Sequence, residues 1–100
     1  KSMIKHLLLL QFKQNTDQKQ IDDMFDQFAD LKSKINGIDS IDYGANKNPE
    51  KLNKSFTHAA VVTFSTARDR DHYLVHPDHK ALETVLLDLL CDLIVFDLEC

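Results

Sequence analysis

The length of 100 residues fits one ordinary domain and argues against a reading with two separately folded units. A net charge of −4, without any cluster of lysine or arginine, argues against a nucleic-acid partner, because binding to the phosphate backbone depends on clustered cations. No segment reaches the roughly 20 apolar residues of a membrane span and none resembles a signal peptide, so we expect no membrane association and a cytoplasmic location.

The two cysteines, Cys91 and Cys100, lie close together near the C-terminus, which is not the disulfide framework of a small secreted protein. Lys1 and Ser2 precede Met3, so one interpretation is that they were added ahead of the native start. We expect a single domain over residues 3–99.

Residues 3–13 alternate in the way that predicts a strand. The face that we expect to pack against helices carries Ile4, His6, Leu8, Leu10 and Phe12. The opposite face is also apolar in part, since it includes Leu7 and Leu9. Such a strand needs cover on both sides, and the helices of one small domain can cover only one of them.

A helix is predicted next, with Thr16 as a candidate N-cap and Gly37 as the stop signal beyond its end. Its apolar positions recur at helical spacing and are Ile21, Met24, Phe25, Phe28, Leu31 and Ile35. A short strand over 38–43 follows and ends at Gly44. The polar run 45–55 is then a loop, long enough to reach a neighbouring molecule.

Residues 56–64 alternate again, which predicts a third strand with His58 and Val62 on the helix side. Ser65 or Thr66 can cap a helix that runs through Val75. Pro77 suits the first turn of another helix, whose inward stripe is Ala81, Leu82, Val85, Leu86 and Leu89. Residues 93–98 are expected to form the last strand.

This order of elements predicts an α+β fold, a ferredoxin-like βαββααβ arrangement with a four-stranded antiparallel sheet and all helices on one face. The first and third strands would be central. The bare face of the sheet would then carry Leu7, Leu9, Ala59, Val61, Ile94 and Phe96. Because an exposed apolar sheet exceeds what monomers usually tolerate, we expect a homodimer that pairs these faces.

The chain has five histidines, and two of them, His6 and His58, belong to the strand faces that we expect under the helices. Each is either a half-buried histidine with one hydrogen bond or a polar group that lines an apolar pocket. Asp97 has the same parity in the last strand and is expected near His6, where it would orient the imidazole for acid/base work. The alternative is that Asp97 is solvated. An offset of four residues would keep His6 and His58 about 13 Å apart.

The segment HYLVHPDH, residues 72–79, holds the densest group of titratable side chains. The spacing of His72, His76 and His79 could suit Zn²⁺ on one helical face, but Pro77 interrupts that helix and the usual metal motifs are missing, so we expect no metal. A joint between two helices is favoured instead. Tyr73 and His79 would flank this joint and point into a pocket under the helices, whereas Asp69, Arg70 and Asp71 would be solvated surface.

Gly37 and Gly44 are the only glycines, so the chain lacks a glycine-rich phosphate loop and a nucleophile elbow. Nucleotide chemistry is therefore not expected, and no cofactor is implied.

From Ile4 to Glu99 the chain resembles the stress-responsive α/β-barrel domain family, which includes boiling-stable plant proteins and a plant cyclase. The segments that carry the likeness are IKHLLLLQFK, YGANKNPEKLNKSFTHAAVVTF, HYLVHPDH and LIVFDLE. The resemblance implies a ferredoxin-like monomer that forms a dimeric α/β barrel with a second copy. It also implies a cation site formed by main-chain carbonyls near Lys32, Ile35 and Ile38.

The resemblance further implies roles for single residues. The acid/base tyrosine and histidine of the family's cyclase match Tyr73 and His79, and its pocket histidines and late aspartate match His6, His58 and Asp97. One position departs from that pattern, since a pocket tyrosine on the first helix corresponds to Phe28 and the wall loses a hydroxyl.

Two functions follow as hypotheses. The first is a small-molecule pocket, cyclase- or lyase-like and without a cofactor, in which His79 removes a proton and Tyr73 stabilises charge at a carbonyl oxygen. We expect the substrate-binding residues to be His6, Leu8, Leu10, Phe28, His58, Val62 and Asp97. The second is a non-enzymatic dimer or larger oligomer in stress tolerance, in which the pocket is only core.

Overall fold

The elements follow one another in the predicted order within residues 2–100, the part of the chain that the computed structural model describes. They are β1 (Ile4–Phe12), α1 (Gln18–Lys34), β2 (Ile38–Ala45), β3 (His58–Phe64), α2 (Ala67–Val75), α3 (Pro77–Leu89) and β4 (Leu90–Glu99). Lys1, one of the two residues interpreted above as added ahead of the native start, lies outside the described residues.

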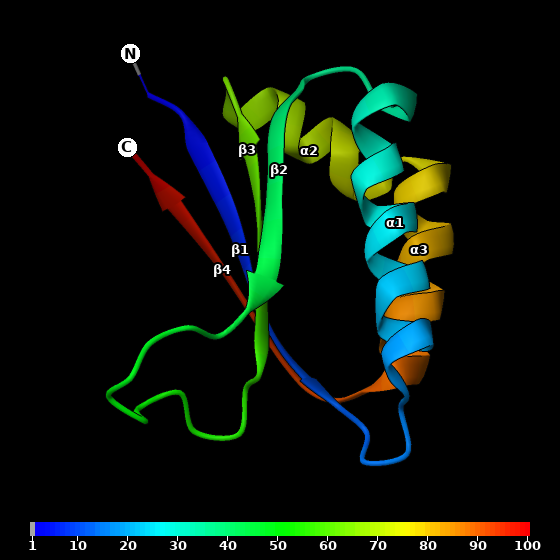
Figure 1. The fold of residues 1–100 in the computed structure, drawn as a ribbon. Helices are drawn as coiled ribbons and strands as arrows, with labels where there is room; N and C mark the ends of the chain where they lie inside the picture. Colours follow the sequence, from blue (N-terminus) through cyan, green and yellow to red (C-terminus); the bar gives the residue numbers. More distant parts are fainter. Residues whose placement is uncertain (1) are drawn as a thin grey trace.

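The four strands form one antiparallel sheet in the order β2-β3-β1-β4, so the first and third strands are central, as predicted. All three helices cover the same face of this sheet (Figure 1). The register sets Leu7 opposite both Val61 on β3 and Phe96 on β4. The ferredoxin-like βαββααβ fold is therefore confirmed.

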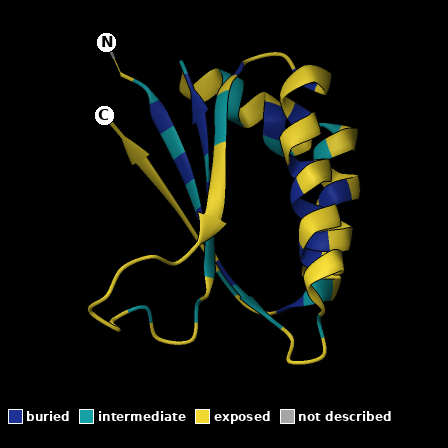
Figure 2. Cartoon of the chain, viewed as in Figure 1, coloured by how far each residue is buried: buried dark blue, intermediate teal, exposed yellow. Residues whose placement is uncertain are grey.

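The core fills the space between α1, α3 and the covered face of the sheet, as the buried residues in Figure 2 show. Every predicted apolar position of the first helix is buried, from Ile21 in α1 to Ile35, the residue that follows its end. On α3 the stripe is narrower than predicted, because Leu82 and Leu86 are buried while Ala81 and Val85 are exposed.

The helix ends are fixed by local hydrogen bonds that correct one prediction. Thr16 is not the cap of α1: Asp17 takes that place, accepting from the backbone N–H of Gln20 while the Gln20 side chain accepts from the N–H of Asp17. Thr66 caps α2, one of the two predicted residues. The His76 side chain caps α3, with Pro77 in its first turn as predicted.

Several strand boundaries differ from the prediction, and β2 runs through Gly44 to Ala45 instead of ending after Tyr43. β3 begins at His58, because residues 56 and 57 belong to the end of the preceding loop. β4 begins at Leu90, because its pairing with β1 continues past a bulge at Gln11 and Phe12 to an extra pair, Phe12 with Leu90.

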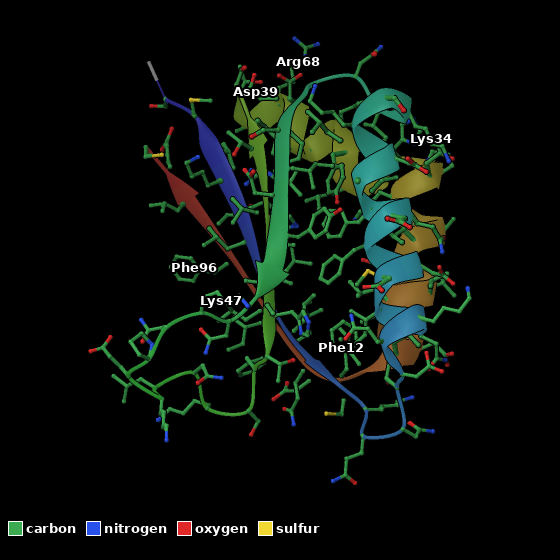
Figure 3. The ribbon with its side chains drawn as sticks, in the orientation of Figure 1. Phe12, Lys34, Asp39, Lys47, Arg68 and Phe96 are labelled. Atoms are coloured by element: carbon green, nitrogen blue, oxygen red, sulfur yellow. The ribbon has the colours of Figure 1, made fainter. Side chains whose placement is uncertain are left out.

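The face of the sheet away from the helices is apolar and uncovered within this chain. Leu9, Ile94 and Phe96 on this face are 38%, 41% and 65% exposed. Phe96 points away from the helices, whereas Phe12 lies on their side (Figure 3). None of the helices within residues 2–100 has the length and apolarity that crossing a membrane would need.

Candidate active site

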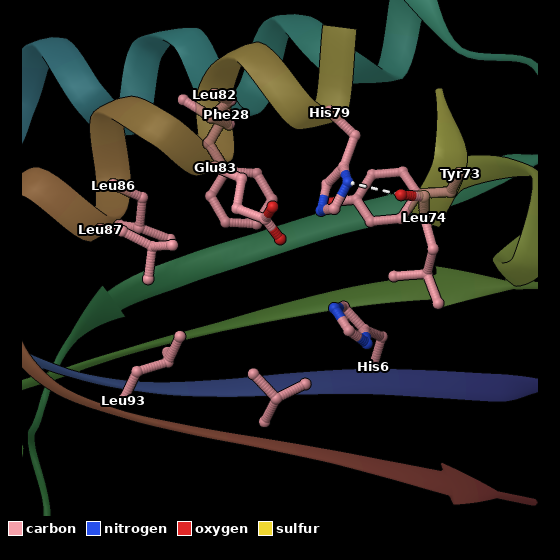
Figure 4. Close-up of a pocket in the computed structure, with 11 residues that line it drawn as sticks. His6, Phe28, Tyr73, Leu74, His79, Leu82, Glu83, Leu86, Leu87 and Leu93 are labelled. Carbon is pink, nitrogen blue, oxygen red and sulfur yellow. Dashed lines mark hydrogen bonds between the residues drawn. The ribbon is translucent and has the colours of Figure 1, made fainter. Parts of the chain in front are cut away.

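A cavity of about 120 Å³ lies between the covered face of the sheet and helices α2 and α3 (Figure 4). Its apolar wall is formed mainly by Phe28, Leu82, Leu86, Leu87, Leu93 and Val95. Its ionisable residues come from three elements and are His6, Tyr73, His79 and Glu83. An apolar cavity with a few convergent polar groups is the usual form of a small-molecule site.

Tyr73 and His79 meet across the joint between α2 and α3, with ring centroids 4.3 Å apart. Val75 ends α2 and Pro77 starts α3, so the two side chains approach each other from successive helices. Tyr73 is only 2% exposed. Its burial raises the pKa of its phenol, and the nearby Glu83 carboxylate raises this pKa further. The phenol therefore keeps its proton at neutral pH and can donate it in a hydrogen bond.

The Tyr73 hydroxyl is left available for such a bond. Among residues 2–100 the hydroxyl has no hydrogen-bond partner. In the same residues, no side-chain oxygen or nitrogen atom that lacks a partner is buried. The hydroxyl must therefore be accessible at the cavity even though the ring is enclosed.

His79 has a defined tautomer. Its Nδ1 lies 3.2 Å from the main-chain oxygen of Leu74, and because a carbonyl can only accept, this nitrogen carries the proton. Nε2 then holds the lone pair. Burial lowers the pKa of His79, against the opposing effect of Glu83, so the imidazole is neutral at neutral pH.

A second histidine is held by a carboxylate and an arginine. His6 Nδ1 lies 2.7 Å from Asp97 Oδ1, which confirms the predicted proximity. The other carboxylate oxygen of Asp97 accepts from Arg70 Nη1, also at 2.7 Å. Burial opposes ionisation of Asp97, but the hydrogen bonds from Arg70 and His6 outweigh it and lower the pKa of Asp97.

The prediction that Arg70 is solvated surface is wrong. The Arg70 side chain is only 23% exposed and reaches from α2 to the edge strand β4. It lies three residues before Tyr73, which puts both side chains on the side of α2 that faces the sheet. That spacing could have pointed to Arg70 from the sequence.

His58 lies away from the cavity that Tyr73 and His79 share. β1 pairs Leu10 with His58 and His6 with Val62, so four residues of strand separate the two histidines, as predicted. The His58 ring packs against Phe12 and Phe25, with centroids 5.2 Å and 5.8 Å away, and burial lowers its pKa.

The other predicted pocket residues divide into two groups. Phe28 forms part of the cavity wall. Leu8, Leu10 and Val62 are buried in the core and are not among the residues that line the cavity.

Glu83 lines the cavity and was missed by the sequence analysis. The signal was present, because residues four apart lie on the same face of a helix and Glu83 follows His79 at that spacing on α3. Leu74, Leu82, Leu86, Leu87, Leu93 and Val95 also line it and were not named as pocket residues.

The three histidines near the joint between α2 and α3 make different contacts. The rings of His72 and His76 lie 5.6 Å apart, and the His76 side chain accepts the backbone N–H of Asp78. His79 instead packs on Tyr73. Within residues 2–100, no three His, Cys, Asp or Glu side chains form a group that could hold a metal ion.

Comparison with known proteins identifies relatives along almost the whole chain. The family model described as Stress responsive A/B Barrel Domain matches residues 4–100. The stress-response A/B barrel domain-containing protein HS1 of Arabidopsis thaliana is 28% identical over 97 residues, which are 97% of this chain and 89% of that protein. Olivetolic acid cyclase of Cannabis sativa is 26% identical over 94 residues, covering 94% of this chain and 93% of the cyclase.

Solved structures share the fold. Hydroxynitrile lyase from Passiflora edulis superposes with a TM-score of 0.92 at 20% identity, over 98% of this chain and 93% of the lyase chain. Three further structures, 18% to 24% identical, are described as dimeric proteins with a ferredoxin-like fold.

Proposed function

Because the chain belongs to the stress-responsive A/B barrel domain family, we propose that it binds a small organic molecule in the cavity under α2 and α3 and catalyses cofactor-independent acid/base chemistry on it. The reaction would be of the cyclase or lyase type. Two relatives support this class, since one is named a cyclase and the other a lyase.

The observation that carries the proposal is that Tyr73 and His79, 4.3 Å apart, open onto one cavity with complementary protonation. Nε2 of His79 is unprotonated and can take a proton from a carbon next to a carbonyl group or from a hydroxyl. The Tyr73 O–H can donate to the carbonyl oxygen on which negative charge develops. The proton held by His79 can then be returned to the product.

The His6 imidazole offers a third polar contact at the same cavity. Asp97 fixes its Nδ1 at 2.7 Å, which leaves Nε2 to face a ligand. We propose that His6 binds and orients the substrate.

The size of the cavity limits the substrate. Its volume of about 120 Å³ is close to that of an apolar cavity of about 150 Å³ that holds benzene. Phe28 contributes no hydroxyl to the wall, so recognition depends on the ionisable residues His6, Tyr73, His79 and Glu83. These features favour a molecule about the size of one substituted ring.

A ligand screen by thermal shift tests the proposal. The wild type and His79→Ala are each melted with and without small aromatic carbonyl compounds, and each protein is compared with its own ligand-free melting temperature. A ligand at ten times its Kd contributes about 1.4 kcal/mol, which raises the melting temperature of a domain of this size by several degrees. We expect that shift in the wild type and a much smaller one in His79→Ala.

His72→Ala is the matched control, because His72 is exposed and does not line the cavity. It should respond to ligands as the wild type does. Equal shifts in the wild type and His79→Ala would contradict a ligand role for His79. No shift with any compound would favour the alternative of a non-enzymatic protein in stress tolerance.

We also propose that a second copy of the chain covers the bare face of the sheet. Leu7, Leu9, Val61, Ile94 and Phe96 form an apolar surface there, and two sheets can pack face to face at about 10 Å. The dimeric ferredoxin-like structures support this assembly.

A further inference from the structure

Glu83 is an exposed residue whose carboxylate lines the cavity. Figure 4 shows its side chain extending from α3 toward the sheet, into the space that His79 and the apolar wall enclose. Among residues 2–100, the Glu83 carboxylate has no hydrogen-bond or ion-pair partner. A carboxylate in this position is available to a ligand.

The charge of Glu83 acts on the groups around it. It raises the pKa of Tyr73 and opposes the effect of burial on His79, which places the carboxylate near both side chains. Lys80 acts on His79 in the opposite sense, but more weakly than Glu83. The Arg70 guanidinium is already paired with two other carboxylates: its Nε lies 2.8 Å from Asp71 Oδ1, and its Nη1 lies 2.7 Å from Asp97 Oδ2.

Glu83 is the only carboxylate among the cavity-lining residues in the described part of the chain. His79 is neutral there, because burial disfavours the imidazolium. A ligand that carried its own carboxylate would be repelled by Glu83, whereas a hydroxyl group could donate a hydrogen bond to it.

We propose that Glu83 determines ligand specificity, so that the cavity accepts uncharged, hydroxyl-bearing molecules of about one ring and rejects carboxylates of the same size. This inference rests on the proposed function, since it requires that the cavity bind a small molecule. It adds the chemical class of the ligand and a residue that selects it.

Benzyl alcohol and benzoate provide a matched pair of probes, because they share one ring and differ in charge. Each is titrated into the wild type, Glu83→Gln and Asp88→Asn, and binding is followed by NMR chemical shifts. Glutamine keeps the oxygen acceptor while it removes the charge. Asp88→Asn removes an equal charge from an exposed position of α3 that does not line the cavity.

We expect the wild type to bind benzyl alcohol about tenfold more tightly than benzoate, a ratio slightly above the roughly fivefold effect of like charges about 4 Å apart in bulk water and well below the effect of an unscreened pair near a protein surface. Glu83→Gln should reduce that ratio about fivefold, mainly by improving benzoate binding. Asp88→Asn should keep the wild-type ratio. The titration is done at low ionic strength, because salt screens exposed charges.

Two results would overturn the inference in different ways. Equal affinities of the wild type for both probes, unchanged in Glu83→Gln, would exclude Glu83 as the selecting residue and leave the proposed ligand site intact. If neither probe binds to any of the three proteins at millimolar concentration, the proposed function fails, and the inference fails with it.

Discussion

Arg70 and Asp97 link α2 to His6, which lines the cavity. Arg70 donates to one oxygen of Asp97, whose other oxygen is bonded to His6. Arg70 and Asp97 are 23% and 29% exposed, so water screens this pair only in part. Arg70 is thus a positioning residue, because it fixes the carboxylate that fixes the ring of His6.

Replacing Arg70 by methionine should lower the free energy of unfolding at pH 7 by about 1 kcal/mol, because a charge-assisted hydrogen bond to a half-buried carboxylate is lost. The loss should depend on pH. The pKa of Asp97 is lower in the folded protein than its usual value near 3.9, so the unfolded chain binds the proton more readily and the pair stabilises the fold above that value. This stabilisation disappears as the pH falls through the folded pKa.

Urea unfolding of the wild type and Arg70→Met from pH 2 to pH 7 measures the effect. The difference between the two proteins should shrink toward zero at the acid end of the series. Arg68→Met, at an exposed position of the same helix, is the control and should unfold like the wild type throughout. A difference that stays constant over the whole pH range would mean that Arg70 contributes through packing alone.

At the scale of elements, the turn after α1 is built around a close approach. Gly37 has a φ of +99°, a conformation that side chains disfavour. A Cβ atom at this position would lie 2.8 to 2.9 Å from the side chain of Asp69, in the first turn of α2. The glycine therefore lets α2 pack against the turn between α1 and β2.

Gly37→Ala should lower the free energy of unfolding by about 1 to 2 kcal/mol, through the strained backbone and the displaced Asp69 side chain. Gly44 is the matched control, because a Cβ atom there would have no neighbour within 4 Å and its φ is not positive. Gly44→Ala should change stability by no more than about 0.5 kcal/mol. Equal midpoints of urea unfolding for the two variants would show that the turn tolerates a side chain.

The sequence predicted the order of elements well, because α1, β1 and β3 carry strong hydrophobic periodicity. The prediction was weaker where tertiary contacts decide the length of an element or the partner of a side chain. The extension of β4 back to Leu90 depends on pairing with Phe12, and the contact of Arg70 with Asp97 depends on how α2 crosses the sheet. Neither effect has a signal in local propensity.

Only part of the candidate site was predicted, because local sequence patterns indicate some of its contacts and tertiary packing decides the others. Strand parity indicated that Asp97 should meet His6, and the joint at Pro77 indicated that Tyr73 and His79 should converge. Strand parity and the family resemblance both made His58 a pocket candidate, but β3 pairs it with Leu10 and its ring packs against Phe12. Glu83 was overlooked because a charged residue at one helical position is usually solvated.

At the scale of the whole molecule, the loop over residues 46–57 extends on the side of the sheet opposite to the helices (Figure 1). Leu52 in this loop is 72% exposed. In a dimer that pairs the bare faces, the loop would extend toward the second copy and could bury Leu52 there. Apolar side chains of the loop and of the bare face would then be removed from water together.

Phe96→Glu tests this assembly, because Phe96 is 65% exposed on the apolar surface that a second copy would cover. Sedimentation velocity at micromolar concentration should find the wild type at twice the chain mass of 11.5 kDa and Phe96→Glu at the mass of one chain. The variant should keep its circular dichroism spectrum, since the side chain is not part of the core of one chain, and its melting temperature should no longer rise with concentration. Val75→Glu, which changes an equally exposed apolar residue on α2, should remain a dimer. A wild type that sediments as a stable single chain would refute the dimer, because the bare face would then be tolerated in water.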